Sequence, residues 1–216
     1  MDRARQPSLF EGDGPVGPRP LDVGTEHEEL GGGAWLELNR GWMNGADQLF
    51  DRLVDIVPWR EEERVMYDHK VAVPRLVAPY AEDVDLPDAS LWASRRALNE
   101  RYGNGSAGPL RTVGICLYRD GRDSVAWHGD RIGRRRDVDT VVAIVSLGCR
   151  RRFLLRPRSG GPSRRFDLGD GDLLVMGGSC QRTWEHTVPK TTRPSGPRIS
   201  VQFRSGGAGA DAGDRY

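Results

Sequence analysis

The residues of this 216-residue chain best suited to chemistry are His128 and Asp130, which stand two positions apart after a β-like run. On an extended segment, side chains two apart point to the same side. An imidazole and a carboxylate that converge in this way form two corners of a metal site. One more nitrogen ligand would complete the two-histidine, one-carboxylate arrangement that leaves coordination positions open on Fe(II). The alternative is a turn aspartate beside a histidine that has no ligand role.

A third ligand has to come from the other histidines of the chain, which are His27, His69 and His186. His27 stands in a Gly- and Pro-rich stretch, and His69 stands in an early segment that contains Lys and Arg. His186 stands in a predicted strand 56 positions after Asp130, and it is the best candidate. By itself, His186 is equally compatible with a buried histidine of the core or its rim.

The segment 198–204 alternates strictly between polar and apolar residues, as a strand with one buried face does. Its apolar face carries Ile199, Val201 and Phe203, and its polar face carries Arg198, Ser200, Gln202 and Arg204. The polar face is either a solvated surface or the lining of a cavity. In the second case, the two guanidiniums have the geometry to bind a dicarboxylate.

The elements that position these residues differ between the two parts of the chain. A helix is predicted over 45–57, where apolar residues recur at helical spacing, with Asn44 placed to cap its start and Pro58 to close its end. A second helix is predicted over 88–102. From 111 onward, short strands are predicted at 111–118, 140–147, 152–156, 172–176, 183–188 and 198–204. This pattern predicts a mainly β structure of the α+β class, with helices packed beside a closed or nearly closed antiparallel sheet.

One domain is expected over 35–204, because 1–34 and 205–216 show no sustained apolar period and are predicted to be flexible tails. No run approaches the roughly 20 apolar residues of a membrane helix, and no signal peptide is visible. The three cysteines, Cys116, Cys149 and Cys180, are too few and too far apart for a disulfide framework. We therefore expect a cytoplasmic monomer with reduced thiols and no membrane contact.

The chain resembles the AlkB family of Fe(II)- and 2-oxoglutarate-dependent dioxygenases in the type, order and spacing of five residues, which are His128, Asp130, His186, Arg198 and Arg204. Members of that family remove alkyl groups from nucleic acids. Segments 117–121 and 171–178 are similar to the strands that precede the family's metal ligands, and 73–75 is similar to its substrate-side lid. The resemblance covers 70–204, and it implies a double-stranded β-helix, a jelly-roll-like barrel, with an N-terminal helical extension.

The resemblance implies two sets of ligands and a reaction. The iron ligands and catalytic residues are His128, Asp130 and His186. The 2-oxoglutarate ligands are Tyr118 and Arg198 at its remote carboxylate, Arg204 at its metal-chelating end, and Ser200. With dioxygen as the other co-substrate, such a centre oxidises an N-alkyl carbon of DNA, or RNA, and releases an aldehyde, succinate and CO2.

The substrate side of the site departs from the family's pattern. Arg75, Tyr80 and Arg131 are the candidates for substrate contact, with Tyr80 as a base-stacking residue. The segment 131–133 stands where members that act on methylated bases often have an acidic pair, so their contact to the exocyclic amine of the base is absent. On the co-substrate side, Cys116 stands where many members have an asparagine, so one hydrogen bond to 2-oxoglutarate is lost or replaced.

Basic side chains are concentrated in the second half of the chain. Residues 1–100 carry 11 basic and 20 acidic side chains, whereas 101–216 carry 21 and 11. Within 131–165 there are 11 arginines and 2 acidic residues. This stretch predicts a surface that attracts the phosphate backbone of alkylated DNA. The alternative is that arginine is abundant because of codon usage, since lysine occurs only at 70 and 190.

Three functions remain open on the sequence. The leading one is an oxidative dealkylase of DNA, or RNA. The second keeps the same cofactors and acts on a protein or a small molecule, and the missing acidic pair favours it. The third is a nucleic-acid-binding module with a structural or vestigial metal site, and the presence of all three metal ligands counts against it.

Overall fold

The computed structural model describes residues 15–21, 24–66, 69–130 and 138–205. Most of its elements are strands. These are β1 (Gly17–Pro18), β2 (Thr25–Gly31), β3 (Ala34–Asn39), β4 (Met43–Asn44), β5 (Arg60–Met66), β6 (His69–Tyr80), β7 (Leu110–Tyr118), β8 (Val125–His128), β9 (Val142–Gly148), β10 (Arg151–Pro157), β11 (Arg164–Leu168), β12 (Leu173–Gly178), β13 (Trp184–Val188) and β14 (Arg198–Ser205). The helices are α1 (Ala46–Ile56), α2 (Ala89–Tyr102) and α3 (Cys180–Thr183).

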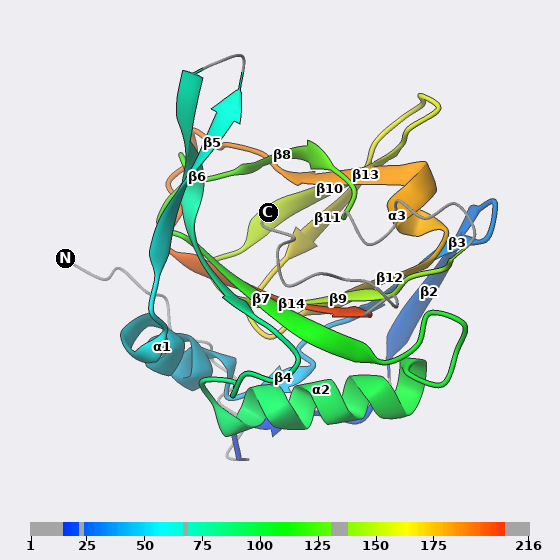
Figure 1. Cartoon of the computed structure of the whole chain (residues 1–216), viewed down its shortest axis with the longest axis horizontal. Coiled ribbons are helices and arrows are strands. Elements are labelled where there is room, and N and C mark those ends of the chain that lie inside the picture. The colour runs from blue at the N-terminus through cyan, green and yellow to red at the C-terminus, as the bar shows by residue number, and fades with distance from the viewer. Residues whose placement is uncertain (1–14, 22–23, 67–68, 131–137, 206–216) are drawn as a thin grey trace.

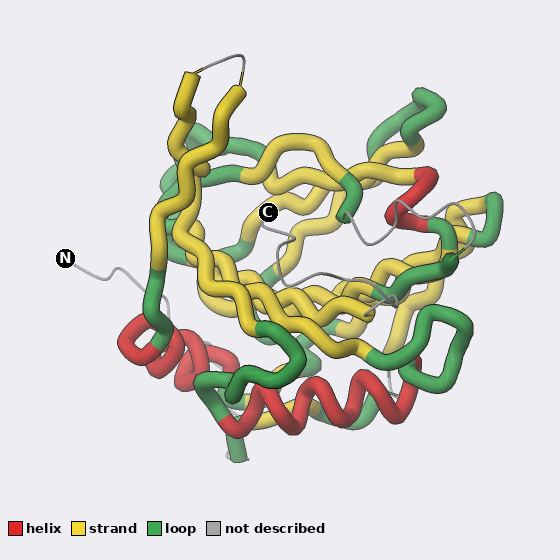
Figure 2. Tube along the Cα trace, viewed as in Figure 1, coloured by secondary structure: helices red, strands yellow, loops and turns green. Residues whose placement is uncertain are grey.

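Two antiparallel sheets face each other, and α1 and α2 cover the outer side of the larger one (Figures 1 and 2). The larger sheet has eight strands in the order β2-β3-β12-β9-β14-β7-β6-β5. The smaller sheet has four strands in the order β11-β10-β13-β8, and β1 pairs with β4 apart from both. Two facing antiparallel sheets are the arrangement expected for a jelly-roll-like double-stranded β-helix.

Alternation along β14 separates two hydrophobic cores. Ile199, Val201 and Phe203 are fully buried in the core that α1 and α2 share with the larger sheet. The opposite face of β14 points into the space between the two sheets, where Arg198 is only 1% exposed and Arg204 only 9%. The polar face of this strand is therefore the lining of an interior cavity, and the solvated-surface alternative is excluded.

The predicted helices and later strands are confirmed, with one correction at a helix end. The helix predicted over 45–57 is α1, but its N-cap is Gly45 at φ 61°, and Asn44 donates from its amide to the carbonyl oxygen of Pro15. A Cβ at position 45 would lie 2.7 Å from Cγ2 of Val16, so this tight corner favours glycine. The helix predicted over 88–102 is α2, whose N-cap Asp88 accepts a hydrogen bond from the backbone N–H of Ser90.

The prediction of a flexible tail over 1–34 is wrong for the part of it that the structure describes as strand. β2 lies within it and pairs with β3 at the edge of the larger sheet, and β3, β5 and β6 also precede the first predicted strand. β2 was missed because an edge strand with mainly exposed side chains carries little apolar signal. Residues 1–14 and 206–216 lie outside the described residues.

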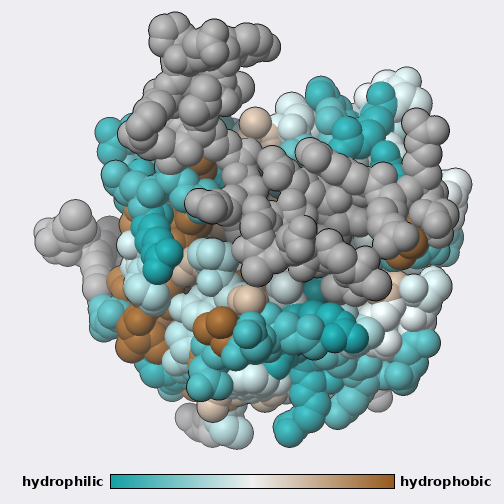
Figure 3. All heavy atoms as spheres, in the orientation of Figure 1, coloured by the Kyte–Doolittle hydropathy of each residue, from teal (hydrophilic) through white to brown (hydrophobic). Residues whose placement is uncertain are grey.

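Hydrophilic residues cover most of the described surface in Figure 3, and the exposed hydrophobic patches are small, one of them in the region of α1. Among the side chains that the structure describes, the exposed large hydrophobic ones are Ile56, Val84 and Trp92. Within the described part of the chain, no helix combines the length and the apolar character that a membrane crossing requires.

Candidate active site

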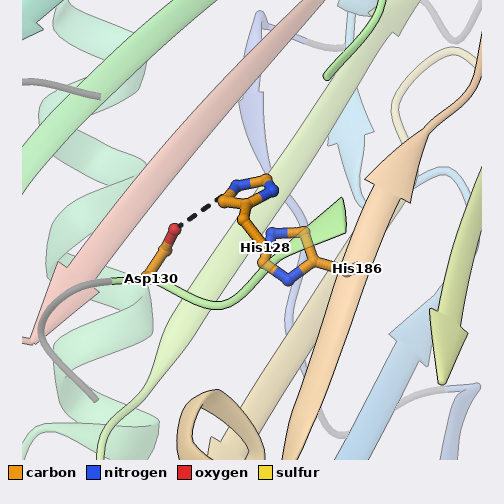
Figure 4. Close-up of side chains that lie close together, drawn as sticks. All are labelled: His128, Asp130 and His186. Carbon is orange, nitrogen blue, oxygen red and sulfur yellow. Dashed lines mark ion pairs between the residues drawn. The ribbon is translucent and has the colours of Figure 1, made fainter. Parts of the chain in front are cut away.

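The two histidines of the site stand directly opposite each other on neighbouring strands. β13 pairs with β8 in the smaller sheet, and in that register His186 faces His128. Their ring centroids are 4.3 Å apart. Asp130 follows β8 by two residues and points back toward His128 (Figure 4). One ligand atom from each of the three side chains lies within 4.8 Å of the other two, so the structure brings together the predicted metal ligands.

Each imidazole is held by its surroundings in a defined orientation. Nδ1 of His128 lies 2.8 Å from the carbonyl oxygen of Ala126, which fixes the proton on Nδ1 and leaves Nε2 with a lone pair. Nε2 faces Oδ1 of Asp130 at 3.8 Å. The ring of His186 stacks on Phe153 with the centroids 5.3 Å apart. Nε2 of His128 and Oδ1 of Asp130 are therefore the atoms that would be available to a metal.

The segment between the first two ligands is packed too tightly for any residue other than glycine. A Cβ on Gly129 would lie 2.6 Å from the carbonyl oxygen of Gln181 and 3.2 Å from that of Trp184. The amide oxygen of Gln181 also accepts a hydrogen bond from the backbone N–H of Asp130 at 2.8 Å. Gln181 belongs to α3, which precedes His186, so it ties the segments of two ligands together. Sequence reasoning missed this residue.

The three side chains have the protonation states that metal ligands need. Burial lowers the pKa of His128, and burial with repulsion from His128 lowers the pKa of His186 to about 3. Burial opposes ionisation of Asp130, but the charge of Arg204 outweighs it, together with the two histidines once acid protonates them, and the pKa of that carboxyl stays below its ordinary value. At neutral pH the site therefore presents two neutral imidazoles and one carboxylate.

A buried guanidinium lies in the same cavity. Arg198 stands opposite Tyr118 across β14 and β7, with its guanidinium 5.3 Å from the centroid of the phenol ring. Its Nε donates to Oγ of Ser146 at 2.9 Å, whereas its buried Nη1 has no hydrogen-bond partner among the described residues. A buried cation with an unused donor is the feature expected where an anionic ligand binds.

The other polar residues of β14 form a network beside the metal ligands. Nε of Arg204 donates to Oδ2 of Asp130 at 2.9 Å, and its Nη2 lies 3.5 Å from Oε1 of Gln202. The amide nitrogen of Gln202 donates to Oγ of Ser200 at 2.6 Å, and the thiol of Cys116 lies 3.7 Å from the amide oxygen. Sequence reasoning placed Gln202 on the polar face of the strand but did not select it as a site residue.

The three substrate-side candidates have different outcomes. Arg75 lines the cavity and donates to the carbonyl oxygen of Ser124 at 3.4 Å. Tyr80 is not among the residues that line the cavity, because it stands five positions after Arg75 on β6 and therefore on the opposite face, in the core beneath the larger sheet. Base stacking by Tyr80 is not supported by that position. Arg131 lies outside the described residues.

Several arginines of the predicted basic surface are engaged within the protein. Arg151 is buried and donates to the carbonyl oxygens of Asp120, Asp123 and Pro189. Three others form ion pairs, which are Arg156 with Glu185, Arg164 with Glu28 and Arg165 with Asp167. Within 138–165, the basic surface is therefore smaller than the count of arginines suggests, and 131–137 lie outside the described residues.

The side chain of His27 lies away from the site. Its Nδ1 lies 3.1 Å from Oε1 of Glu37, its Nε2 lies 2.9 Å from Oε1 of Glu29, and its ring stacks on Trp35. Among the described residues, the cluster of His128, Asp130 and His186 is the one group with metal-ligand geometry. Its donor set suits Fe(II), and the adjacent Arg198 suits a dicarboxylate.

A family model described as the 2OG-Fe(II) oxygenase superfamily matches residues 43–204. The alpha-ketoglutarate-dependent dioxygenase alkB homolog 3 of Homo sapiens is 29% identical over 179 residues, which is 74% of this chain and 61% of the human protein. The DNA oxidative demethylase ALKBH2 of Arabidopsis thaliana is 33% identical over 110 residues, or 40% of this chain and 35% of that protein. The chain thus spans about three fifths of the length of alkB homolog 3.

A solved structure, that of OsALKBH1, is similar with a TM-score of 0.55 and 16% identity, and the match covers 84% of this chain and 100% of that one. A prolyl hydroxylase from Trichoplax adhaerens, solved in complex with a peptide fragment, matches with a TM-score of 0.55 at 12% identity over 79% of this chain and 83% of that one. At these identities the likeness bears on the fold alone, and it agrees with the predicted jelly-roll-like barrel.

Proposed function

The chain belongs to the 2OG-Fe(II) oxygenase superfamily and is of the AlkB type, and on that premise we propose that it uses Fe(II), 2-oxoglutarate and dioxygen to remove N-alkyl groups from nucleic-acid bases. The observation that carries the proposal is the presence of two complementary features in one cavity. The three metal ligands occupy one side, and Arg198 with its unpartnered Nη1 lies in the same enclosure.

The residues present fit both groups. Nε2 of His128, Oδ1 of Asp130 and His186 would hold the metal on one face and leave the opposite face to other ligands. Arg198 and Tyr118 would bind the remote carboxylate of 2-oxoglutarate. A guanidinium that is otherwise left with an unused buried donor gains most from such a ligand.

The chain's own residues do the positioning and the iron and co-substrate supply the oxidation. When bound, the iron and 2-oxoglutarate would use dioxygen to hydroxylate the alkyl carbon, which then leaves as an aldehyde, with one oxygen atom entering that carbon and the other entering the succinate that forms with CO2. Arg204 and Ser200 would lie beside the metal-chelating end of the co-substrate. Burial of the whole polar face of β14 keeps water away from these charges and strengthens their interactions.

A nucleic-acid substrate is supported by the names of the relatives and by the charge distribution. One relative is a DNA oxidative demethylase, and 101–216 hold 21 basic and 11 acidic side chains. We propose that alkylated DNA, or RNA, binds beside the Arg-rich stretch 131–165, of which the structure describes 138–165, with Arg75 nearest the base. Arg131, the other candidate for substrate contact, lies outside the described residues. Such a base leaves the stack to reach the metal, at a cost of a few kcal/mol that is smallest for weakened pairs.

A second candidate keeps the same cofactors and acts on a protein or a small molecule. Two observations favour it, which are the absence of an acidic pair after Asp130 and the internal ion pairs of Arg156, Arg164 and Arg165. If it holds, the enzyme will convert 2-oxoglutarate slowly on its own, and no alkylated oligonucleotide will stimulate that conversion.

The test is turnover on a panel of N-methylated oligonucleotides, single- and double-stranded. The protein is loaded with Fe(II) and 2-oxoglutarate without oxygen, and oxygen and oligonucleotide are then added. We expect succinate and aldehyde in equal amounts, restored bases for at least one lesion, and no product with Asp130→Ala. Turnover that no methylated oligonucleotide stimulates would overturn the nucleic-acid assignment.

A further inference from the structure

The side chain of Gln202 is locked in one orientation. It is 7% exposed and lines the cavity, and its Nε2 donates to the carbonyl oxygen of Ser200 at 2.9 Å and to Oγ of the same residue at 2.6 Å. A backbone carbonyl can only accept, and Arg204 on the other side can only donate. The amide oxygen of Gln202 must therefore face Arg204, and the opposite flip would place like groups together at both ends.

Two of the described contacts of Arg204 are made at different nitrogens. Nε donates to Oδ2 of Asp130 at 2.9 Å, and Nη2 lies 3.5 Å from Oε1 of Gln202. Because the guanidinium is planar, two contacts at different nitrogens define its plane as well as its position. The second contact comes from the same strand, two residues away, so β14 itself sets the angle at which Arg204 meets the carboxylate.

That angle determines which oxygen of Asp130 is available to a metal. Arg204 takes Oδ2, and Oδ1 is left facing Nε2 of His128 at 3.8 Å. A carboxylate that is bound at one oxygen by a fixed guanidinium acts as a one-oxygen ligand. If Arg204 rotated, Oδ2 would be released and both oxygens could approach the metal.

We propose that Gln202 is a positioning residue that, through Arg204, keeps Asp130 as a one-oxygen metal ligand. The proposal rests on the metal site of the proposed function, and it concerns a residue whose described hydrogen bonds include none to the three ligands. Cys116 belongs to the same arrangement, since its small thiol meets the amide oxygen of Gln202 at 3.7 Å and leaves Arg204 as the closer donor.

The test is an anaerobic titration with Co(II), without 2-oxoglutarate or nucleic acid, because the visible absorption of Co(II) reports the geometry of its ligands as well as its affinity. The variants are Gln202→Leu, which removes the amide, and Gln202→Glu, which keeps an oxygen toward Arg204. Gln48→Leu is the matched control, since Gln48 is an exposed residue of α1 and undergoes the same chemical change.

For Gln202→Leu we expect Co(II) affinity to fall about tenfold, the lower end of the usual effect of residues that orient metal ligands, with an altered visible spectrum. Gln202→Glu should bind Co(II) with an affinity within about threefold of that of the wild type, since it retains a strong acceptor toward Arg204. Gln48→Leu should bind Co(II) as the wild type does. Unchanged affinity and spectrum in Gln202→Leu would overturn the proposal. Should that variant fail to fold, Gln202→Met removes the amide from a side chain of similar length, and unchanged affinity and spectrum in it would overturn the proposal equally.

The result for Gln202 can be distinguished from the result for the proposed function. A wild type that binds Co(II) but transforms no alkylated substrate would overturn the dealkylase assignment, and the comparison of the Gln202 variants would still decide the role of this residue. A wild type that binds no Co(II) would overturn both.

Discussion

Arg204 donates from Nε to Oδ2 of Asp130 at 2.9 Å, although 74 positions separate the two residues in the sequence. Both side chains are nearly buried. The pair connects β14, a central strand of the larger sheet, to the segment that follows β8 at the edge of the smaller sheet. The carboxylate is therefore ionised and oriented before any metal arrives.

The first prediction concerns that pair. Arg204→Lys keeps the charge but loses the second contact of the guanidinium, so Fe(II) affinity should fall by about 10- to 100-fold. Arg40→Lys is the control, because Arg40, although half exposed, also forms an ion pair with a buried carboxylate, that of Asp172, away from the site, at 2.6 Å. Anaerobic Fe(II) titration checks both variants, and equal affinities would show that Arg204 does not orient Asp130.

The second prediction separates binding of the co-substrate from binding of the metal. In Arg198→Lys the side chain is shorter and has no guanidinium fork, so it loses a charged hydrogen bond to the co-substrate. That loss of about 1.5–3 kcal/mol should weaken 2-oxoglutarate binding by roughly 10- to 150-fold. Metal affinity in the absence of 2-oxoglutarate should not change, since Arg198 contacts none of the three ligands among the described contacts. Isothermal titration with and without metal measures the two effects, and a parallel loss of both would contradict this division.

The third prediction tests the close packing between the first two ligands. Gly129→Ala places a methyl group 2.6 Å from the carbonyl oxygen of Gln181, so the backbone must shift, at a cost of about 1–3 kcal/mol in the free energy of unfolding. The shift also moves Asp130, so metal affinity should fall with stability. Gly17→Ala is the control, because nothing lies within 4 Å of a Cβ there. Thermal unfolding and metal titration of the two variants should diverge, and similar results would refute the packing argument.

The fourth prediction uses His27, whose pKa is raised by hydrogen bonds to Glu29 and Glu37. A pKa that is higher in the folded than in the unfolded state stabilises the fold below the ordinary histidine value of 6.5, and this contribution is lost as pH rises through the folded-state pKa. The melting temperature should thus decline across that range in the wild type and decline less in His27→Gln. Identical pH profiles would remove His27 as the source of the decline.

The sequence placed the candidate ligand residues better than the residues that hold them in position. His128 and Asp130 share a side on any extended segment, and the alternation of 198–204 placed Arg198 and Arg204 on one face, so local geometry was sufficient. Tyr80 and Arg75 are an odd number of residues apart on β6 and therefore lie on opposite faces, but the sequence analysis predicted no strand there.

Other features depend on contacts that a single sequence does not reveal. Gln181 meets Asp130 across 51 positions, because α3 packs against the segment that follows β8. β2 is a strand because β3 provides a partner for it, while its own residues are mainly polar and exposed. Register and docking between distant segments determine such features, and periodicity within a segment carries no information about either.

The most direct test of the central claim is the binding of 2-oxoglutarate, measured without oxygen by calorimetry, to three forms of the protein: metal-free wild type, metal-loaded wild type, and metal-treated His186→Ala. If His128, Asp130, His186 and Arg198 form one site, 2-oxoglutarate will bind tightly to the metal-loaded wild type and much more weakly to the other two forms. Equal binding to all three forms, or no binding to the folded and metal-loaded protein, would contradict the account.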